Sequence, residues 1–292
     1  MTKKRVYAYA KINLFLDISG KMDNGFHIIN SVMQTVSLAD VIDILVWKDA
    51  PLQIIVRCES DYAPSGTDNI ASRAAALYLE RAGISARVEV ELKKNIPSPA
   101  GMGGGSADAA AVLRGLNEIF ECFEKKELEL LSAEIGSDIP FCISGGTQLA
   151  RGRGEILCEC RKIPDCHIVI GCGKDKMPTS TAYALIDEKY EDFKLVNGTR
   201  DKDDFIVSLD SARNMSDAMY NIFEDVSIEK CPSVKCLKEL MLENGALGAL
   251  MSGSGPAVFG IFENEQKALN AVSEIKKHGF FSTACVPVDK YL

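Results

Sequence analysis

The feature that most constrains the fold is a segment rich in proline and glycine at residues 97–107, which leads directly into an alanine-rich stretch. It contains three adjacent glycines, Gly103, Gly104 and Gly105, and glycine lets the backbone adopt positive φ and approach a ligand closely. Ser106 is a good N-cap for a helix. Because free N–H groups and the helix dipole favour anions at a helix start, the segment predicts a phosphate-binding loop. A flexible loop before a capped helix is the structural alternative.

Two familiar phosphate-binding loops do not fit this segment. No Gly-Lys-Ser/Thr follows the glycines, so the lysine of a P-loop is absent. The glycine spacing also differs from the dinucleotide-binding fingerprint, and no doubly wound sheet is evident around it. Asp108 falls in the first turn of the expected helix, where a favourable interaction with the helix dipole is enough to account for a carboxylate.

The first strand, expected at residues 5–18, carries an unusual pair of polar side chains. Apolar residues alternate along one face, and Lys11 and Asn13 fall on the other. An edge strand with a solvated face would explain this pattern structurally. Periodicity and turn signals predict the other elements. Strands are expected at 40–47, 52–57, 86–92, within 145–160, and at 167–171, 246–251, 257–262 and 281–287; helices are expected after Asp68-Asn69 to about Arg81, from 106, and at 126–135, 213–225, 231–243 and 264–277.

The chain is long enough for two domains, because its 292 residues can bury ample apolar surface in each. A soft boundary near residue 161 predicts an N-terminal domain at 1–160 and a C-terminal domain at 161–292. The last part of the chain alternates strand, glycine turn, strand, helix and strand, which is typical of a compact αβ unit. The charged stretch 187–204 is expected to be an exposed connector.

Composition excludes several classes of protein. The formal net charge is −8 without a basic stripe, which argues against a nucleic-acid partner. No apolar run approaches the roughly 20 residues that span a bilayer, and Lys11 and Asn13 interrupt the segment where a signal peptide would be apolar. Ten cysteines without a Cys-x-x-Cys pair suggest reduced, mostly buried thiols. We therefore expect a soluble cytoplasmic protein with no membrane partner.

Four further segments each have a structural explanation when taken singly. They are Ala-Tyr-Ala-Lys-Ile-Asn-Leu at 8–14, Asp-Asn-Gly-Phe-His at 23–27, Gly-Ser-Asp-Ile-Pro-Phe at 136–141 with Gly-Gly-Thr at 145–147, and Met-Ser-Gly-Ser-Gly-Pro at 251–256. In this order, and together with the glycine loop, they resemble the motifs of the GHMP kinase superfamily. The resemblance runs from about residue 8 to the C-terminus. It is closer still to the members that act on a cytidine diphosphate-linked methylerythritol.

The resemblance implies an α+β, two-domain GHMP kinase fold. The N-terminal domain would resemble the second domain of ribosomal protein S5, the C-terminal domain would be ferredoxin-like, and the active site would lie between them. It also implies an activity, the ATP-dependent phosphorylation of the 2-hydroxyl of that small-molecule substrate in non-mevalonate isoprenoid precursor synthesis. ATP would be the phosphoryl donor and Mg²⁺ would bridge its phosphate oxygens.

The resemblance assigns Lys11 and Asp138 as a catalytic pair. Asp138 would accept or orient the proton of the substrate hydroxyl, and Lys11 would keep Asp138 ionised and bias charge toward the transferring group. The metal ligands are unknown, and the hydroxyl of Ser106 is a candidate. ATP binding falls to Pro97, Ser98, Pro99, Ala100, Gly101, Met102, Gly103, Gly104, Gly105, Ser106 and Ala107.

The same resemblance assigns a cytosine-reading role to His27, which by itself would be interpreted as a surface or capped histidine. Phe26 and Tyr183 would supply aromatic faces for the base, and Asn13 would bind the substrate near Lys11. Three residues depart from the usual pattern: Phe26 replaces a tyrosine, Tyr9 a proline and Pro178 a serine. The expected substrate-binding residues are Asn13, Phe26, His27, Thr179 and Tyr183.

Two rival functions are compatible with parts of this pattern. Another GHMP kinase could act on homoserine or mevalonate, but the mevalonate- and galactose-type members open with a Gly-Glu-His-like motif, and this chain has Lys-Ile-Asn-Leu at 11–14. A catalytically inactive relative could bind nucleotide as a regulator, and the presence of both Lys11 and Asp138 argues against it. The oligomeric state is left open.

Overall fold

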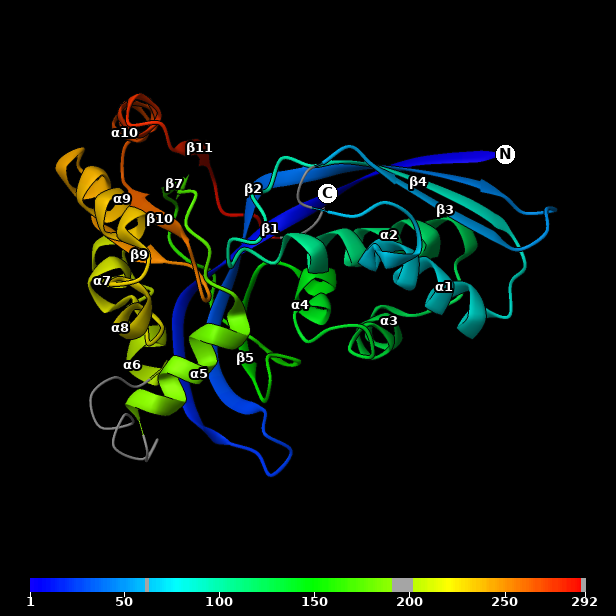
Figure 1. The fold of residues 1–292 in the computed structure, drawn as a ribbon, viewed down its shortest axis with the longest axis horizontal. Helices are drawn as coiled ribbons and strands as arrows, with labels where there is room; N and C mark the ends of the chain where they lie inside the picture. The colour runs from blue at the N-terminus through cyan, green and yellow to red at the C-terminus, as the bar shows by residue number, and fades with distance from the viewer. Residues whose placement is uncertain (61–62, 191–201, 290–292) are drawn as a thin grey trace. The chain divides into compact units, whose positions relative to one another are not determined.

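The computed structural model describes residues 1–60, 63–190 and 202–289 (Figure 1). Contacts within the chain divide it into two compact units. The first unit consists of Met1–Ala10, Leu38–Ser98 and Gly103–Ser144, and the second of Lys11–Ser37, Pro99–Met102 and Gly145–Leu292. The division expected near residue 161 stays a prediction.

Two long strands, β1 (Thr2–Lys21) and β2 (His27–Trp47), form a hairpin, and each continues from one unit into the other. They belong to the larger sheet, whose hydrogen-bonded order is β3 (Gln53–Cys58), β4 (Arg87–Lys93), β2, β1 and β8 (Tyr220–Asn221). Strand β5 (Thr147–Arg151) pairs with β2 and with β6 (Ile156–Glu159). The sequence predicted only the second half of β2. The first half was missed because Ser31, Gln34 and Thr35 are polar yet buried, which hides the alternation expected of a half-buried strand.

In the first unit, helices cover a face of the sheet (Figure 1). Helix α1 begins after Asn69, whose side chain accepts a hydrogen bond from the Ala71 N–H, and ends at Gly83 in a left-handed conformation. A β-carbon on Gly115 of α2 would lie 2.5 Å from Cδ1 of Ile44 on β2, so this glycine lets the helix pack closely on the strand. The elements of this unit besides β1 and β2 are β3 (Gln53–Cys58), η1 (Gly66–Asp68), α1 (Ile70–Ala82), β4 (Arg87–Lys93), α2 (Gly104–Phe120), α3 (Lys125–Ser132) and α4 (Ile139–Ser144).

The second unit contains the αβ structure predicted for the end of the chain. Its four strands are antiparallel, in the order β11-β7-β10-β9, and two helices pack against them (Figure 1). Apolar side chains such as Phe262, Leu237 and Ile275 join in one buried core. The elements are β7 (His167–Cys172), α9 (Pro232–Glu243), β9 (Gly248–Met251), β10 (Ala257–Phe262), α10 (Glu265–Lys277) and β11 (Phe281–Cys285).

The helix predicted at 213–225 is wrong in its middle, where the short strand β8 pairs in parallel with Phe15 and Leu16 of β1. Because β1 has β2 on one side and β8 on the other, it is not an edge strand. The expected connector at 187–204 overlaps the end of helix α5 and the start of helix α6. Its residues 191–201 lie outside the described residues. The remaining elements are β5 (Thr147–Arg151), β6 (Ile156–Glu159), α5 (Thr179–Lys189), α6 (Lys202–Val207), α7 (Ala212–Ala218), β8 (Tyr220–Asn221) and α8 (Glu224–Ser227).

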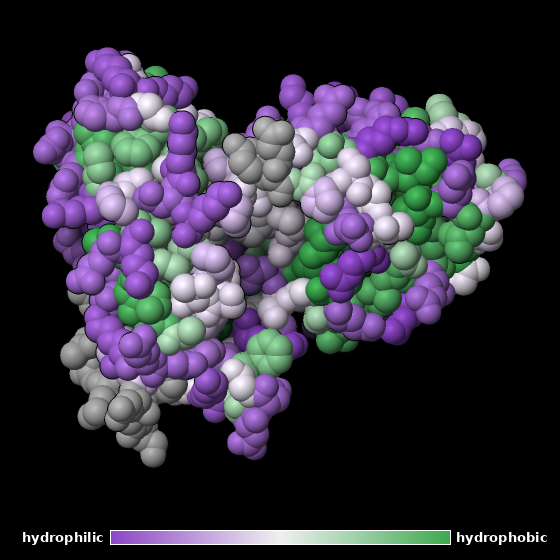
Figure 2. Space-filling view, in the orientation of Figure 1, coloured by the Kyte–Doolittle hydropathy of each residue, from purple (hydrophilic) through white to green (hydrophobic). Residues whose placement is uncertain are grey.

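On the face drawn in Figure 2, hydrophilic residues surround smaller groups of hydrophobic ones. Among the described residues, no helix combines the length and the apolar character that crossing a membrane requires.

Candidate active site

The glycine loop opens helix α2 as predicted, but Ser106 is not its N-cap. Gly103 takes that position with φ of +66°, and its carbonyl accepts the first helical hydrogen bond, from the Ala107 N–H at 2.8 Å. The N–H groups of Gly104, Gly105 and Ser106 therefore have no partner within the helix. Three adjacent donors at the positive end of a 17-residue helix suit an anion such as phosphate.

Positive φ is confined to part of the loop, at Gly101 (+74°) and Gly103 (+66°), whereas Gly104 and Gly105 are already helical. Gly104 is needed for a different reason. A β-carbon there would lie 3.3 Å from Cγ2 of Ile96 and 3.7 Å from Nζ of Lys94. The missing side chain thus brings the helix start close to a lysine.

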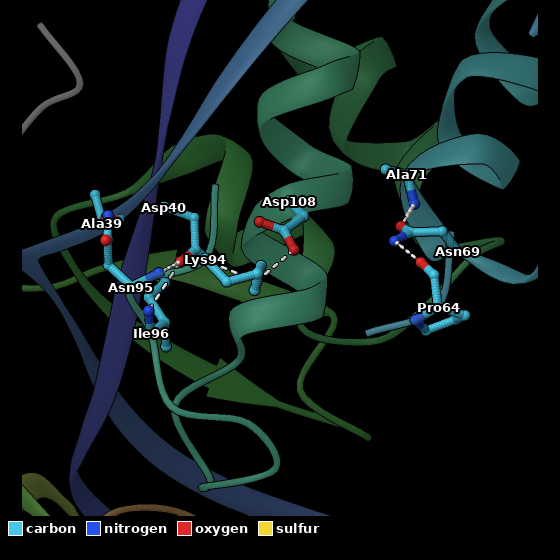
Figure 3. A network of polar contacts seen from close by, with 9 residues as sticks. All are labelled: Ala39, Asp40, Pro64, Asn69, Ala71, Lys94, Asn95, Ile96 and Asp108. Atoms are coloured by element: carbon cyan, nitrogen blue, oxygen red, sulfur yellow. Dashed lines mark hydrogen bonds and ion pairs between the residues drawn. The ribbon is translucent and has the colours of Figure 1, made fainter. Parts of the chain in front are cut away.

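That lysine, Lys94, is buried between two carboxylates (Figure 3). Its Nζ lies 2.5 Å from Oδ2 of Asp108 and also forms an ion pair with Asp40. The carboxylate of Asp40 in turn accepts hydrogen bonds from the N–H groups of Asn95 and Ile96 (Figure 3). The cluster of Asp40, Lys94 and Asp108 therefore ties the residues that enter the glycine loop to the helix that leaves it.

The structural role expected for Asp108 is wrong in kind. Asp108 is the fifth residue of α2 and lies beyond the first turn, where a carboxylate would interact with the helix dipole alone. Its carboxylate instead accepts a hydrogen bond from Lys94. Burial raises the pKa of Asp108 to about 7, an effect that Lys94 opposes and Asp40 reinforces. Lys94 was missed in the sequence because a lysine at the end of a strand is usually solvated, and only its position three residues before Pro97 distinguishes it.

In the second unit, the middle of the loop packs on the Ser-Gly-Ser-Gly turn of residues 252–255. A β-carbon on Gly101 would lie 2.0 Å from the carbonyl oxygen of Ser252, and one on Gly253 would lie 2.9 Å from the carbonyl oxygen of Gly101. The Oγ of Ser252 donates to that same Gly101 oxygen at 3.0 Å, and the Ala257 N–H donates to Ala100 at 3.3 Å. Two motifs that are far apart in the sequence therefore fit together backbone to backbone.

Asn221, which the sequence analysis missed, supports this turn. Its side-chain amide donates to the carbonyl oxygens of Met251 and Gly253 at 2.7 and 2.8 Å. Thr179, an expected substrate-binding residue at the start of α5, reaches the turn as well, with its Oγ1 3.1 Å from Oγ of Ser254. No sequence signal singled out Asn221, since its neighbours were expected to be helical.

Lys11 and Asn13 face the same side of β1 and are buried, so the solvated-face explanation for this pair is wrong. Nζ of Lys11 donates to Oδ1 of Asn13 at 2.6 Å, and Nδ2 of Asn13 donates to Oγ of Ser31 at 2.8 Å. The backbone N–H of Lys11 also donates to the carbonyl of Met102 in the glycine loop, at 3.1 Å. This arrangement holds Lys11 in a fixed position beside the loop, at the expense of the hydration of its ammonium group.

Asp138 belongs to the first unit and stands directly before α4, where its carbonyl accepts from the Cys142 N–H at 3.1 Å. The next residues, Ile139, Pro140 and Phe141, are buried and anchor this short helix. Asp138 itself is half-buried. Lys11 belongs to the second unit, so the pairing of these two residues stays a proposal.

The expected base-reading residues form a cluster in the second unit. The ring of His27 stacks on that of Tyr183, with centroids 4.5 Å apart and an angle of 23° between the planes. Nε2 of His27 lies 2.6 Å from Oδ1 of Asp187, whose other oxygen accepts from Nζ of Lys21 at 2.7 Å. Asp187 was missed because no helix was expected at 179–189.

Phe26, at the end of the β1–β2 hairpin connection, remains half exposed, with the guanidinium of Arg153 5.1 Å from its ring centroid. An exposed aromatic ring of this kind leaves apolar surface on which a planar base could stack.

A helix start whose N–H groups have no partner within the helix suits an anion, as the site of a small-molecule kinase requires, and comparison with known proteins agrees. The model described as "GHMP kinases N terminal domain" matches residues 69–146, and the one described as "GHMP kinases C terminal" matches residues 206–280. The chain belongs to the GHMP kinase family, and the two-domain fold implied by its motifs is confirmed.

Curated relatives narrow the comparison within that family. A protein of Caldicellulosiruptor saccharolyticus named 4-diphosphocytidyl-2-C-methyl-D-erythritol kinase is 40% identical over 95% of this chain and 96% of its own length. Proteins of the same name from Acetivibrio thermocellus and Macrococcus caseolyticus are each 39% identical over 92% of this chain and 93% and 94% of their own lengths.

Solved structures agree with the curated relatives. A crystal structure of 4-(cytidine 5'-diphospho)-2C-methyl-D-erythritol kinase aligns with a TM-score of 0.82 at 31% identity, over 97% of this chain and 99% of that one. A homoserine kinase from Cytophaga hutchinsonii aligns with a TM-score of 0.76 over 100% of this chain and 96% of that one, but at 19% identity it shows the shared fold alone.

Proposed function

We propose that this chain transfers the γ-phosphoryl group of ATP to the 2-hydroxyl of 4-diphosphocytidyl-2-C-methyl-D-erythritol, a step of non-mevalonate isoprenoid precursor synthesis. The relatives that share 36–40% of its residues carry the name of this kinase. The observation that carries the choice of substrate is the stack of His27 on Tyr183, with the exposed ring of Phe26 on the residue that precedes His27 in the sequence. Such a group of rings suits a nucleobase, which homoserine and mevalonate lack.

ATP binding falls to residues 97–107. The N–H groups of Gly104, Gly105 and Ser106 would bind phosphate oxygens, and the packing of Gly101 on Ser252 would hold the loop in shape. The Lys94 cluster adds support at the entry to the loop, because Asp40 binds two successive backbone N–H groups there. Positioning of this kind supplies much of the catalysis in phosphoryl transfer.

In the reaction, Asp138 would take the proton of the substrate hydroxyl as the oxygen of that hydroxyl bonds to the γ-phosphorus and the bond to ADP breaks. Lys11 would offset the negative charge of the transferring group and keep Asp138 ionised. The hydrogen bond from Lys11 to Asn13 supports this role, because it fixes the direction of the ammonium group. Asn13 would then also contact the substrate next to the reacting hydroxyl.

Mg²⁺ fits this site, although the chain itself offers few ligands for it. Among the residues that the structure describes, no three His, Cys, Asp or Glu side chains form a metal-binding group. Mg²⁺ in kinases commonly takes most of its ligands from phosphates and water, so a single protein oxygen can suffice. The hydroxyl of Ser106, in the first turn of α2, is the oxygen that we propose. When bound, the ion would neutralise the phosphate charge that develops during transfer.

The test is ATP consumption by the purified chain with three acceptors: the cytidylyl substrate, homoserine and mevalonate. We expect turnover with the cytidylyl substrate at a kcat/KM at least a hundredfold above the other two. Preference for homoserine or mevalonate would overturn the choice of substrate. Tight ATP binding without turnover on any of the three would identify a regulator that only binds nucleotide. We further propose that the protein works in the cytoplasm on this small molecule, without a nucleic-acid or membrane partner.

A further inference from the structure

Helix α5 holds the imidazole of His27 on two sides. Tyr183 lies against the face of the ring, at 4.5 Å between centroids, and Asp187 lies at its edge, 2.6 Å from Nε2. Tyr183 and Asp187 are four residues apart, so they project from the same face of the helix. The side chain of His27 is only 8% exposed, which leaves the ring little freedom to turn.

Asp187 is a strong hydrogen-bond acceptor in this setting. Its partial burial would raise its pKa, but the hydrogen bonds from Lys21 and His27 outweigh that effect and lower the pKa of Asp187. An ionised carboxylate can only accept hydrogen bonds, so Nε2 of His27 must carry the proton that is shared with it. In the neutral imidazole, Nδ1 is then the acceptor.

We propose that Asp187 is the positioning residue for base recognition, because it fixes the tautomer in which Nδ1 of His27 accepts a hydrogen bond. This inference rests on the proposed cytidylyl substrate. Cytosine carries an exocyclic amino group that can donate to Nδ1, whereas uracil has a carbonyl oxygen at the same position, which would face the nitrogen lone pair. A fixed tautomer therefore favours cytosine, and a ring free to exchange tautomers would lose that preference.

Two variants separate this role from a general effect of charge. Asp187→Asn keeps the shape of the side chain but presents an amide that can either accept or donate, so it no longer dictates the tautomer. Glu188→Gln removes the same charge from the next residue of α5, which is exposed. We expect Asp187→Asn to lower the cytidylyl-to-uridylyl ratio of kcat/KM at least tenfold, mainly through KM for the nucleotide-linked substrate. The KM for ATP should hold, and Glu188→Gln should match the wild type.

A second measurement does not need turnover. The chain has three histidines, so the ring nitrogens can be assigned in a long-range ¹H–¹⁵N spectrum with the help of His27→Ala. We expect the wild-type His27 signals to show a protonated Nε2 with an unprotonated Nδ1, and Asp187→Asn to shift them toward a mixture of tautomers. A protonated Nδ1 with an unprotonated Nε2 in the wild type, or an unchanged selectivity ratio in Asp187→Asn, would overturn the inference. Failure of the proposed function would look different, because the wild type itself would then not phosphorylate the cytidylyl substrate.

Discussion

The carbonyl oxygen of Ser252 lies 2.0 Å from the point where a β-carbon on Gly101 would have to be, so these two residues meet only because one of them lacks a side chain. The hydroxyl of Ser252 also donates to the carbonyl of Gly101, across 151 residues of sequence. The glycine loop therefore takes its shape from a distant turn as well as from its own composition.

Gly101→Ala should consequently weaken ATP binding at least tenfold and destabilise the fold. The new methyl group would clash with backbone, which cannot move aside as a flexible side chain could. Gly279→Ala is the matched control, because Gly279 has a similar positive φ of +81° but nothing within 4 Å of its β-carbon position. Both variants should carry the cost of about 1–2 kcal/mol for a left-handed alanine, and only Gly101→Ala should lose ATP affinity in a calorimetric titration. Equal ATP affinity in the two variants would contradict the packing argument.

Asp138→Asn should lower the rate of phosphoryl transfer by about 10²- to 10⁴-fold, because the amide cannot take the proton of the substrate hydroxyl. ATP affinity should hold, since the loop and not Asp138 is assigned to nucleotide binding. Single-turnover kinetics and nucleotide titration measure the two effects separately. Asp165→Asn, at an exposed turn, provides a control for the loss of a carboxylate and should keep the wild-type rate. An Asp138→Asn enzyme that retained more than about a tenth of the rate would exclude the general-base role.

Lys94→Met should destabilise the first unit by about 3–5 kcal/mol, because it leaves Asp40 and Asp108 buried without a counter-charge. Lys125→Met is the control. Nζ of Lys125 lies 4.0 Å from Glu129, and the side chain is 62% exposed, so this pair should contribute about 0–1 kcal/mol. Urea unfolding measures the loss of stability in both variants. Adding Asp108→Asn to Lys94→Met should recover part of the loss, and a Lys94→Met protein within about 1 kcal/mol of the wild type would contradict a buried charge cluster.

The buried carboxyl group of Asp17 should make the free energy of unfolding depend on pH. Burial raises its pKa from 3.8 to about 6, with a smaller contribution from Asp225, although the Ile18 N–H donates to it. Between these two values the folded state keeps a proton that the unfolded state has released, so the contribution of Asp17 to stability is lost as pH rises. Relative to the wild type, Asp17→Asn should therefore gain stability from about pH 4 to pH 6 and show a constant difference above that range. A difference that does not change with pH would show that Asp17 titrates normally in the folded protein.

The motifs of the site could be predicted from the sequence because each depends on local chemistry. Glycines before an alanine-rich stretch indicate a loop and a helix start, and the alternating end of the chain indicates an αβ unit. The expected N-cap at Ser106 was wrong because glycine in a left-handed conformation can end the loop three residues earlier, at Gly103.

The supporting residues could not be predicted, because each depends on a contact that is distant in sequence. Lys94 meets Asp40 only after β4 pairs with β2, and Asn221 meets Gly253 only after the second unit has folded. Asp187 was hidden because Thr179, Ser180 and Thr181 have low helix propensity, so α5 was not expected. Without that helix, nothing in the sequence relates Asp187 to Tyr183.

The most direct measurement of the central claim is the ³¹P spectrum of the product formed from ATP and 4-diphosphocytidyl-2-C-methyl-D-erythritol. Carbon 2 of this substrate bears a methyl group and no hydrogen, so a phosphate on its oxygen has no proton three bonds away. The account predicts a new monophosphate signal without three-bond coupling to hydrogen, alongside the signals of the intact diphosphate and of ADP. A triplet would place the new phosphate on the primary hydroxyl at carbon 1, a doublet would place it on carbon 3, and either pattern, or no new monoester signal, would contradict the claim.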